Sequence, residues 1–356
     1  MLMRAARMYG YHQPLRLEEI PVPAPGPDEV LVKVAATGMC RSDHQLLEGY
    51  FQRAAPMEFP AVPGHEVAGH VAGTGSAVPR SAGLAEGELV LVSAGWGDGT
   101  CRQCHEGNEQ LCTGTGGWIG FGPPGGFAEY VAVPHRHLVQ VPGGDQKAEH
   151  LAPLTDAGLT PYRGVKKLVA AGKLGPGRTV VVVGIGGLGS YAVQYAKLLG
   201  GGATVVAFSR TDEKLAVARQ GGADHTVNTR DLSSRQVQDE LERLTGRRTV
   251  DAILDCAGAP ASIALDFEIL AAEGAVASVG LMGTKVEVPL NVIVGTELSY
   301  FGSFWGNHND LTEVLALAAA GQIRHTVTTV NFEDINDNLE ALARGDVVGR
   351  QVIVFD

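Results

Sequence analysis

Short runs of alternating apolar and polar positions dominate the first part of the chain. One region, Leu15–Val34, is interrupted by four prolines between positions 21 and 27, and similar runs recur at Glu88–Val92 and Ala128–Val133. A period of two positions in runs broken by proline is typical of antiparallel strands with one buried face. We therefore expect a β-rich first domain.

The pattern changes near Ala157, where β-branched runs begin to alternate with helical segments. The expected strands are Thr179–Val183, Ala203–Phe208, Asp251–Asp255, Ala275–Val279 and Leu298–Phe301. Segments of helix length, such as Ser190–Gly200 and Thr211–Gly221, separate the first of these runs. Strands joined by helices form a parallel sheet. One more helical pattern and a closing strand, Gln351–Phe355, end the chain.

These patterns predict an α/β fold with two domains, which the length of 356 residues can supply with separate cores. We expect residues 1–157 and 303–356 to form a catalytic domain around a doubly wound sheet of residues 158–302. The active site is expected in the cleft between them.

Composition and charge exclude several classes of protein. The chain is 45% hydrophobic and 19% charged, with no apolar run long enough for a membrane span, and its net charge is −11. Such a charge repels nucleic acid and anionic lipid, so neither is expected as a partner. Residues 1–10 lack the apolar run of a secretory signal, and we expect a soluble, cytoplasmic protein.

A glycine-rich loop follows the strongest apolar strand, Val180–Val183. It contains Gly184, Gly186, Gly187, Leu188 and Gly189 and leads into a helix over Tyr191–Leu199. Glycines let the backbone approach a pyrophosphate, while the helix N-terminus offers free N–H groups. A plain strand–helix turn is the alternative, but the surrounding βαβ pattern favours dinucleotide binding.

The end of the next strand bears on the choice of cofactor. A carboxylate there would bind the ribose 2′-hydroxyl of NAD, but the position holds Ser209, followed by Arg210. A hydroxyl and a guanidinium suit a 2′-phosphate, which favours NADP(H) over NAD(H). Alternatively, Arg210 is only a solvated surface charge and Ser209 tolerates either cofactor.

Three of the five cysteines crowd into one short segment. Asp98, Cys101, Cys104 and Cys112 have the spacing of a closed tetrahedral site, which is typical of structural zinc. A carboxylate oxygen is an acceptable zinc ligand, although His105 could take the place of Asp98. The alternative is a set of buried thiols without metal.

A second group of candidate ligands is dispersed along the chain. It consists of Cys40, His65 and Asp156. Spacing alone does not link them, because each could serve as a core cysteine, a turn histidine or a helix N-cap.

Taken in order, these segments resemble the zinc-containing medium-chain dehydrogenases, most closely the bacterial and archaeal secondary-alcohol dehydrogenases. The resemblance covers essentially the whole chain and rests on the Gly38–His44 segment, Gly64-His65-Glu66, the cysteine segment, Pro153–Gly158, the glycine loop and Gly349-Arg350. It implies a GroES-like catalytic domain, a Rossmann domain, two zinc ions per subunit and hydride transfer between NAD(P) and a small alcohol or carbonyl compound.

The resemblance also implies roles for individual residues. Cys40, His65 and Asp156 hold the catalytic zinc, and Glu66 is a further ligand that can replace water. Ser42 takes the alcohol proton and Asp43 orients His65. Two residues are expected near the cofactor pyrophosphate, Arg41 and Arg350.

The sequence departs from the family in two ways. A relay histidine found in many relatives is replaced by Gln45, with His44 one residue earlier, and its role in proton transfer is an open question. Asp98 and Asp156 stand where many members have cysteine. Candidates for an apolar substrate wall, each of which could also be ordinary core, are Trp96, Trp118, Phe121 and Trp305.

Alternatives remain within and beyond this class. The substrate could be a polyol or an aryl (cinnamyl-type) alcohol, or the chain could be a catalytically silent NADP-binding relative. The zinc-free quinone and enoyl reductases lack the Cys40, His65 and cysteine-segment pattern. We expect a homo-oligomer, a homotetramer or a dimer.

Overall fold

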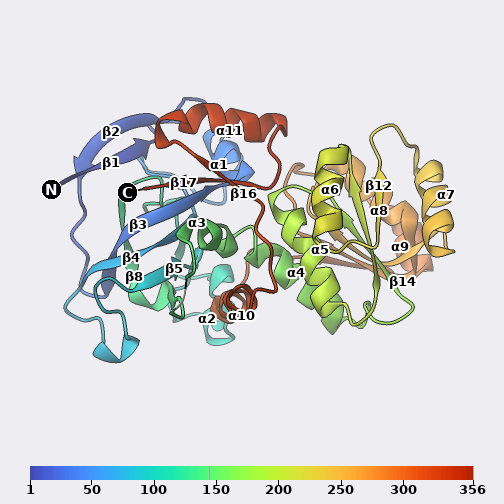
Figure 1. Ribbon diagram of the computed structural model, residues 1–356, viewed down its shortest axis with the longest axis horizontal. Helices are drawn as coiled ribbons and strands as arrows, with labels where there is room; N and C mark the ends of the chain where they lie inside the picture. The colour runs from blue at the N-terminus through green and yellow to red at the C-terminus, as the bar shows by residue number, and fades with distance from the viewer. Residues whose placement is uncertain (144, 356) are drawn as a thin grey trace. The chain divides into compact units, whose positions relative to one another are not determined.

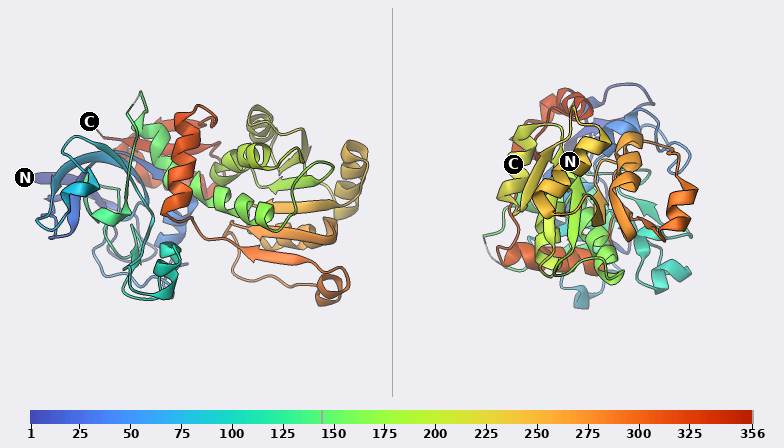
Figure 2. Two further views of the ribbon diagram at one scale, coloured as in Figure 1. Left: turned by 90° about the horizontal axis from the view of Figure 1, so that it is seen from below. Right: turned by 90° about the vertical axis from the view of Figure 1, so that its right-hand side faces the viewer.

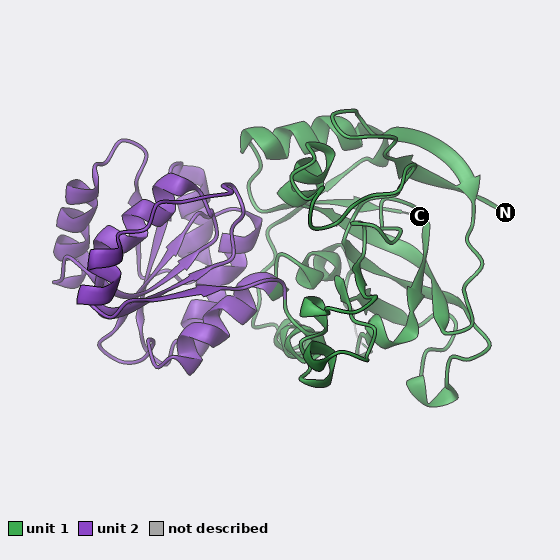
Figure 3. Ribbon diagram, turned by 180° about the vertical axis from the view of Figure 1, so that it is seen from behind, with its two compact units in different colours: residues 1–159, 306–356 green, residues 160–305 purple. Residues whose placement is uncertain are grey.

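The computed structural model describes residues 1–143 and 145–355. The chain divides into two compact units, one made of residues 1–159 and 306–356 and the other of residues 160–305 (Figure 3). The first unit is therefore assembled from both ends of the chain. Among the described residues, no helix is long and apolar enough to cross a membrane.

A seven-stranded sheet forms the centre of the first unit. Its strands, in sheet order, are β16 (Val327–Val330), β17 (Arg350–Val354), β3 (Glu29–Met39), β4 (Glu66–Thr74), β5 (Leu89–Val92) and β9 (Leu138–Gln140), with β8 (Tyr130–Pro134) paired to β3. Only the β16–β17 pair of this sheet is parallel. Every second residue over Val30–Val34 is fully buried, as expected for a strand with one face on the core.

Smaller elements surround this sheet. The two-stranded ribbons are β1 (Leu2–Arg7) with β2 (Arg16–Pro21), and β6 (Gly95–Trp96) with β7 (Gly117–Trp118). The helices of this unit are α1 (Arg41–Leu47), α2 (Arg102–His105), α3 (Ala148–Leu151), α10 (His308–Ala319) and α11 (Ile335–Arg344). Helices α1 and α11 lie side by side although they come from opposite ends of the chain (Figure 1).

The second unit is built on a six-stranded parallel sheet. Its strands, in sheet order, are β12 (His225–Asn228), β11 (Thr204–Ser209), β10 (Thr179–Val183), β13 (Val250–Asp255), β14 (Leu270–Ser278) and β15 (Ser299–Gly302). Helices cover both faces of this sheet, and they are α4 (Leu159–Ala170), α5 (Gly187–Leu199), α6 (Asp212–Gln220), α7 (Ser234–Thr245), α8 (Pro260–Ile269) and α9 (Leu290–Gly295) (Figure 2). Every residue of β10 is buried, which explains its unbroken β-branched run.

The strand order of this sheet reverses at β10. The chain moves outward from β10 through β11 to β12 and then returns to β13 on the other side of β10. In doubly wound sheets, ligands bind at the carboxyl ends of the strands where the order reverses. The glycine loop that follows β10 lies at this point.

The expected α/β class is confirmed, and the strands predicted in the second unit appear within one residue of their expected ends, except that β14 starts at Leu270 and not at Ala275. The start of one helix also differs. Helix α5 starts at Gly187 and not near Ser190, because the last glycines of the loop already form its first turn. Strand β12 was missed, since its four residues, His225–Asn228, show no apolar alternation.

Candidate functional site

Three buried side chains of the first unit converge on one point. Cys40 follows the last residue of β3 and caps α1, and His65 precedes β4, which pairs with β3 through Gly38 and Glu66. Asp156 ends a short 3₁₀ turn at Ala152–Thr155. The potential ligand atoms of Cys40, His65 and Asp156 all lie within 4.8 Å of one another.

The Asp43 carboxylate orients two of these side chains. Its Oδ2 accepts the backbone N–H of Cys40 at 2.8 Å, and its Oδ1 lies 2.9 Å from Nδ1 of His65. The opposite ring nitrogen, Nε2, lies 3.5 Å from Oδ2 of Asp156. Asp43 therefore leaves Nε2 of His65 directed toward the other two ligands. A carboxylate on the outer nitrogen of a histidine is a frequent support of metal ligation.

Charged groups in and around the cluster stabilise one another. Burial disfavours the His65 imidazolium, but the charge of Asp43 and the hydrogen bond to Asp156 outweigh it and raise the pKa of His65. Burial also opposes ionisation of Asp156, yet His65 and Arg350 lower its pKa. The three potential ligands are a thiol, an imidazole and a carboxylate. This set of donors fits zinc.

Arg350 enters the cluster from β17, near the end of the chain. Its Nη2 lies 2.8 Å from Oδ2 of Asp156 and 2.5 Å from Oε1 of Glu66. Glu66 also accepts the backbone N–H of Ala157 at 2.9 Å. Burial raises the pKa of Glu66 against the opposing charge of Arg350. A Cβ at Gly38 would overlap the Glu66 carboxylate, so glycine is required there.

These ion pairs bear on two roles predicted from sequence. The Glu66 carboxylate faces Arg350 and is not part of the Cys40, His65 and Asp156 cluster. Arg350 is 4% exposed, and its guanidinium is engaged by two carboxylates of the same unit. Metal ligation by Glu66 and a pyrophosphate contact by Arg350 stay predictions, and ligation by Glu66 needs its carboxylate to leave Arg350.

Other predicted residues lie on α1. The Ser42 hydroxyl donates to Sγ of Cys40 at 2.9 Å and lies 3.5 Å from Nε2 of His65, so it borders the cluster. His44 is half-buried on the same helix and is not a member of the Cys40, His65 and Asp156 group. Arg41 is half-buried in the first turn of α1.

Aromatic side chains line one side of the cluster. The Phe121 ring lies 5.2 Å from the His65 ring and 5.1 Å from Phe51, and Trp118 follows at 6.5 Å from Phe121. Phe51 escaped the sequence reasoning because a single loop phenylalanine has no recognisable pattern. Of the other expected wall residues, Trp96 stacks on His137 in the first unit, and Trp305 packs beside Phe304 in the second unit.

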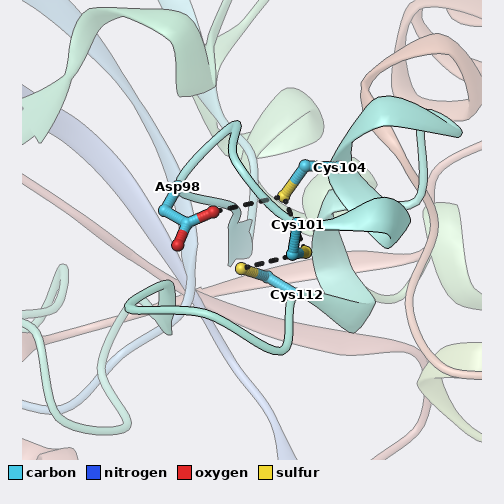
Figure 4. Close-up of side chains that lie close together, drawn as sticks. All are labelled: Asp98, Cys101, Cys104 and Cys112. Atoms are coloured by element: carbon cyan, nitrogen blue, oxygen red, sulfur yellow. Dashed lines mark hydrogen bonds between the residues drawn. The ribbon is translucent and has the colours of Figure 1, made fainter.

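The second predicted metal site lies in the segment between β6 and β7. Ligand atoms of Asp98, Cys101, Cys104 and Cys112 lie within 4.8 Å of one another (Figure 4). Sγ of Cys101 is 3.6 Å from that of Cys104 and 3.8 Å from that of Cys112. His105, the alternative fourth ligand, is not a member of this group. A carboxylate and three thiols within this distance fit a tetrahedral zinc site.

Hydrogen bonds from nearby backbone groups change the pKa values of these side chains. Backbone N–H groups of Thr100 and Thr115 lower the pKa of Asp98, and those of Cys104 and Thr113 lower the pKa of Cys101 to about 6. Burial instead raises the pKa of Cys104 to about 11. Glycine at 114 makes room for the Asp98 carboxylate, because a Cβ there would overlap it.

The glycine loop of the second unit has a distinct geometry. Gly184 adopts a φ of 85°, and Gly189 packs so closely on its carbonyl that a Cβ would overlap it. At Gly186, the N-cap of α5, a Cβ would meet none of the described residues within 4 Å. Gly187 and Leu188 form the first turn of α5. The backbone at Gly186 thus stays open on the side where a ligand can approach.

The end of β11 presents a second guanidinium that sequence reasoning missed. Ser209 is 7% exposed and Arg210 is exposed. Nε of Arg230, which follows β12, donates to the carbonyl of Arg210 at 2.8 Å, while the Arg230 backbone N–H donates to Asn228. The spacing of 20 residues gives no local signal, and only the pairing of β11 with β12 brings Arg230 here.

Comparisons with known proteins agree with this geometry. Residues 26–143 match the family described as alcohol dehydrogenase GroES-like domain, and residues 187–320 match zinc-binding dehydrogenase. An NAD-dependent alcohol dehydrogenase of Sulfurisphaera tokodaii is 36% identical, with 99% of this chain and 100% of that protein covered. A D-arabinose 1-dehydrogenase (NADP(+)) of Saccharolobus solfataricus is 31% identical, with 98% and 97% covered.

Among solved structures, the chain is similar to an alcohol dehydrogenase from the hyperthermophilic archaeon Aeropyrum pernix. The TM-score is 0.91 at 36% identity, and 99% of this chain and 100% of that chain are covered.

We predict that the two clusters bind metal independently. Cys104→Ser should remove one of two zinc equivalents and lower the melting temperature by about 5 °C or more, because a closed metal site contributes folding energy. Cys40→Ser should remove the other equivalent and change the melting temperature much less. Elemental analysis and differential scanning fluorimetry measure both effects. A single zinc equivalent in the fully reconstituted wild type would contradict the prediction.

Proposed function

Because the chain belongs to the zinc-dependent medium-chain alcohol dehydrogenases, we propose that Cys40, His65 and Asp156 hold its catalytic zinc and that Ser42 handles the substrate proton. The enzyme transfers a hydride between NAD(P) and an alcohol or carbonyl compound. The observation that carries the proposal is the convergence of three buried ligands with the Ser42 hydroxyl beside them.

Each residue of the cluster has a defined task in this proposal. Zinc supplies a Lewis acid for the substrate oxygen and the nicotinamide accepts or donates the hydride. Asp43 keeps Nε2 of His65 directed at the ligand cluster, and Ser42 holds the proton of the substrate hydroxyl at Oγ. Arg350 balances the charge of Asp156 and Glu66. Cys40, His65 and Asp156 would hold the zinc and leave room for the substrate oxygen.

The aromatic side chains favour an apolar substrate. Phe121 packs against His65, with Phe51 and Trp118 behind it. These rings would exclude water and accept the hydrocarbon part of a small hydrophobic alcohol or ketone. A polyol would leave its hydroxyl groups without partners on such a wall. We therefore propose small apolar alcohols and ketones as substrates ahead of polyols.

A second zinc is proposed for Asp98, Cys101, Cys104 and Cys112. These four groups would hold a tetrahedral ion with no position left for substrate, so its role would be structural. A metal site of three neighbouring thiols requires that they stay reduced. Because the cytoplasm keeps thiols reduced, this site supports a cytoplasmic location.

We further propose a preference for NADP(H). Arg210 and Arg230 bring two guanidinium groups to the end of β11, where the 2′-position of a dinucleotide bound at the glycine loop would lie. The nearby Asp212 carboxylate accepts from Nδ2 of Asn228 at 3.0 Å. The names of the relatives include both NAD and NADP and do not decide between the two cofactors. The proposal rests on Arg210 and Arg230.

An apolar surface of the second unit supports self-association. Strand β15 ends its sheet, so one edge of its backbone is open for pairing. Seven large apolar side chains between positions 281 and 300 are exposed, namely Leu281, Met282, Val286, Val288, Leu290, Val294 and Tyr300. A second copy could pair its β15 with this edge about a two-fold axis and cover both patches. We propose a homo-oligomer, a dimer or tetramer, formed through this surface.

The role of Ser42 can be tested without disturbing the metal. Ser42→Ala should lower kcat about 10²–10⁴-fold, because the proton loses its acceptor, while both zinc equivalents and the melting temperature are kept. Ser42→Thr retains the hydroxyl and serves as the control. Steady-state oxidation of a small secondary alcohol gives the rates. Full activity of Ser42→Ala would exclude the role.

Cofactor preference has its own test. Arg210→Ala should reduce the ratio of kcat/KM for NADP over NAD about ten- to hundredfold, because a charge-assisted bond to the phosphate is lost. Ser209→Asp should reverse the preference by repelling the phosphate. Arg219→Ala, on the exposed face of α6, is the matched control. The assignment fails if the wild type prefers NAD and Arg210→Ala leaves the ratio unchanged.

Self-association is tested by charging the apolar surface. Val294→Glu combined with Leu290→Glu should shift the protein toward the monomer in size-exclusion chromatography with light scattering, since buried unpaired charges disfavour an interface. Val169→Glu changes another exposed valine, on α4, and should leave the assembly intact. An unchanged oligomer in the double variant would place the interface elsewhere.

A further inference from the structure

Two buried carboxyl groups of the second unit have no role in the function proposed above. Asp255 ends β13 and Asp266 lies on α8, and both are 0% exposed. Oδ1 of Asp255 accepts the backbone N–H groups of Ala257 at 2.6 Å and Gly258 at 2.7 Å. Among the described residues, no donor reaches Oδ2 of Asp255 or either oxygen of Asp266.

The two carboxyl groups lie within hydrogen-bond reach of each other. Two adjacent buried carboxylates cannot both be ionised without a large energetic cost, and one shared proton removes that cost. Burial and the charge of Asp255 raise the pKa of Asp266 well above its usual range. A neutral Asp266 would donate from one of its oxygens to Oδ2 of Asp255, and this bond would involve two of the three oxygens that otherwise lack a partner.

Little else around the pair is ionisable. Cys256 adjoins it, and burial together with the charge of Asp255 raises the pKa of its thiol. The buried side chains of the neighbouring α7, Val237 and Leu241, are apolar. The buried residues of β10 and β14 carry no ionisable side chain.

Asp255 fixes a turn that supports the glycine loop. The Cys256 backbone N–H donates to the carbonyl of Val183 at 2.9 Å, which ties the turn to the end of β10. A Cβ on Gly184 would lie only 3.0 Å from the Cβ of Ala257, so the turn is the wall against which the loop packs. On its other side, Ala257 accepts from Met282 at 3.1 Å.

We propose that Asp266 is a positioning residue for the dinucleotide: its protonated carboxyl holds Asp255, and Asp255 holds the Ala257–Gly258 turn against Gly184. This inference rests on the proposed placement of the cofactor at the glycine loop. Cofactor affinity therefore depends on a buried proton of the second unit that is not part of the glycine loop itself. Affinity falls as the pH rises through the titration of the shared proton, since the raised pKa favours the protonated pair at lower pH.

The test compares three variants of the whole enzyme. The Kd of NADPH, or of NADH if the wild type prefers it, is measured by cofactor fluorescence between about pH 6 and 10. Asp266→Leu leaves Oδ2 of Asp255 without a donor and should raise Kd at least about tenfold. Asp266→Asn supplies a permanent donor and should bind as the wild type does, without the alkaline loss. Phe267→Leu, a neighbouring buried change on α8, should lower stability and leave Kd unchanged.

The outcomes separate this inference from the cofactor site itself. Wild-type binding by Asp266→Leu, or an alkaline loss that persists in Asp266→Asn, overturns the inference. If Asp266→Leu does not fold, the pH dependence of Kd in Asp266→Asn decides between the two outcomes. Cys256→Ala shows whether the Cys256 thiol causes the loss of affinity at alkaline pH. Gly186→Val should block the cofactor by placing a side chain in the open space above the loop. Normal binding by Gly186→Val would instead refute the proposed cofactor site.

Discussion

The hydrogen bonds of the Asp43 carboxylate organise the candidate catalytic centre. One oxygen holds the backbone of Cys40 and the other holds the ring of His65, so a single buried side chain fixes two of the three ligands. Asp43 can do this because α1 starts directly after β3 and turns its first residues back toward the strand end. Without that carboxylate, the His65 ring would lose its hydrogen bond at Nδ1, and the backbone N–H of Cys40 would lose its acceptor.

The same centre explains why the first unit needs both ends of the chain. Two acids are buried there, the candidate ligand Asp156 and its neighbour Glu66, and their charges need a cation because water does not solvate them. Arg350 provides it from the last strand, β17, which pairs with β3. The second unit uses a different device at its own loop, where burial and a shared proton would replace a counter-ion for Asp255 and Asp266. In each unit, a buried carboxyl group holds a backbone segment next to a candidate site.

Local signals in the sequence predicted the features that lie within one short segment. The glycine loop and its flanking strand and helix were recognised because φ above zero and close backbone packing demand glycine. The cysteine segment was recognised because its four ligands lie within 15 positions. The dispersed site is different, since Cys40, His65 and Asp156 each have an ordinary alternative, and only the family resemblance brought them together before the structure did.

Contacts made by folding alone could not be predicted. Arg350 and Glu66 are 284 positions apart, and nothing in either segment indicates their pairing. Arg230 reaches Arg210 only through the pairing of neighbouring strands, and an aspartate such as Asp266 on a short helix is usually exposed. The alternation of apolar positions predicted where strands lie in the sequence, but it does not indicate which strands are neighbours in a sheet.

The central claim is that Asp43 and Arg350 shape a zinc site at Cys40, His65 and Asp156. Anomalous scattering at the zinc edge from crystals of the zinc-loaded enzyme tests it most directly. The account predicts a peak bonded to Sγ of Cys40, Nε2 of His65 and a carboxylate oxygen of Asp156, with Nδ1 of His65 still on Asp43. No peak at this position, or a metal bound through Nδ1, would contradict it.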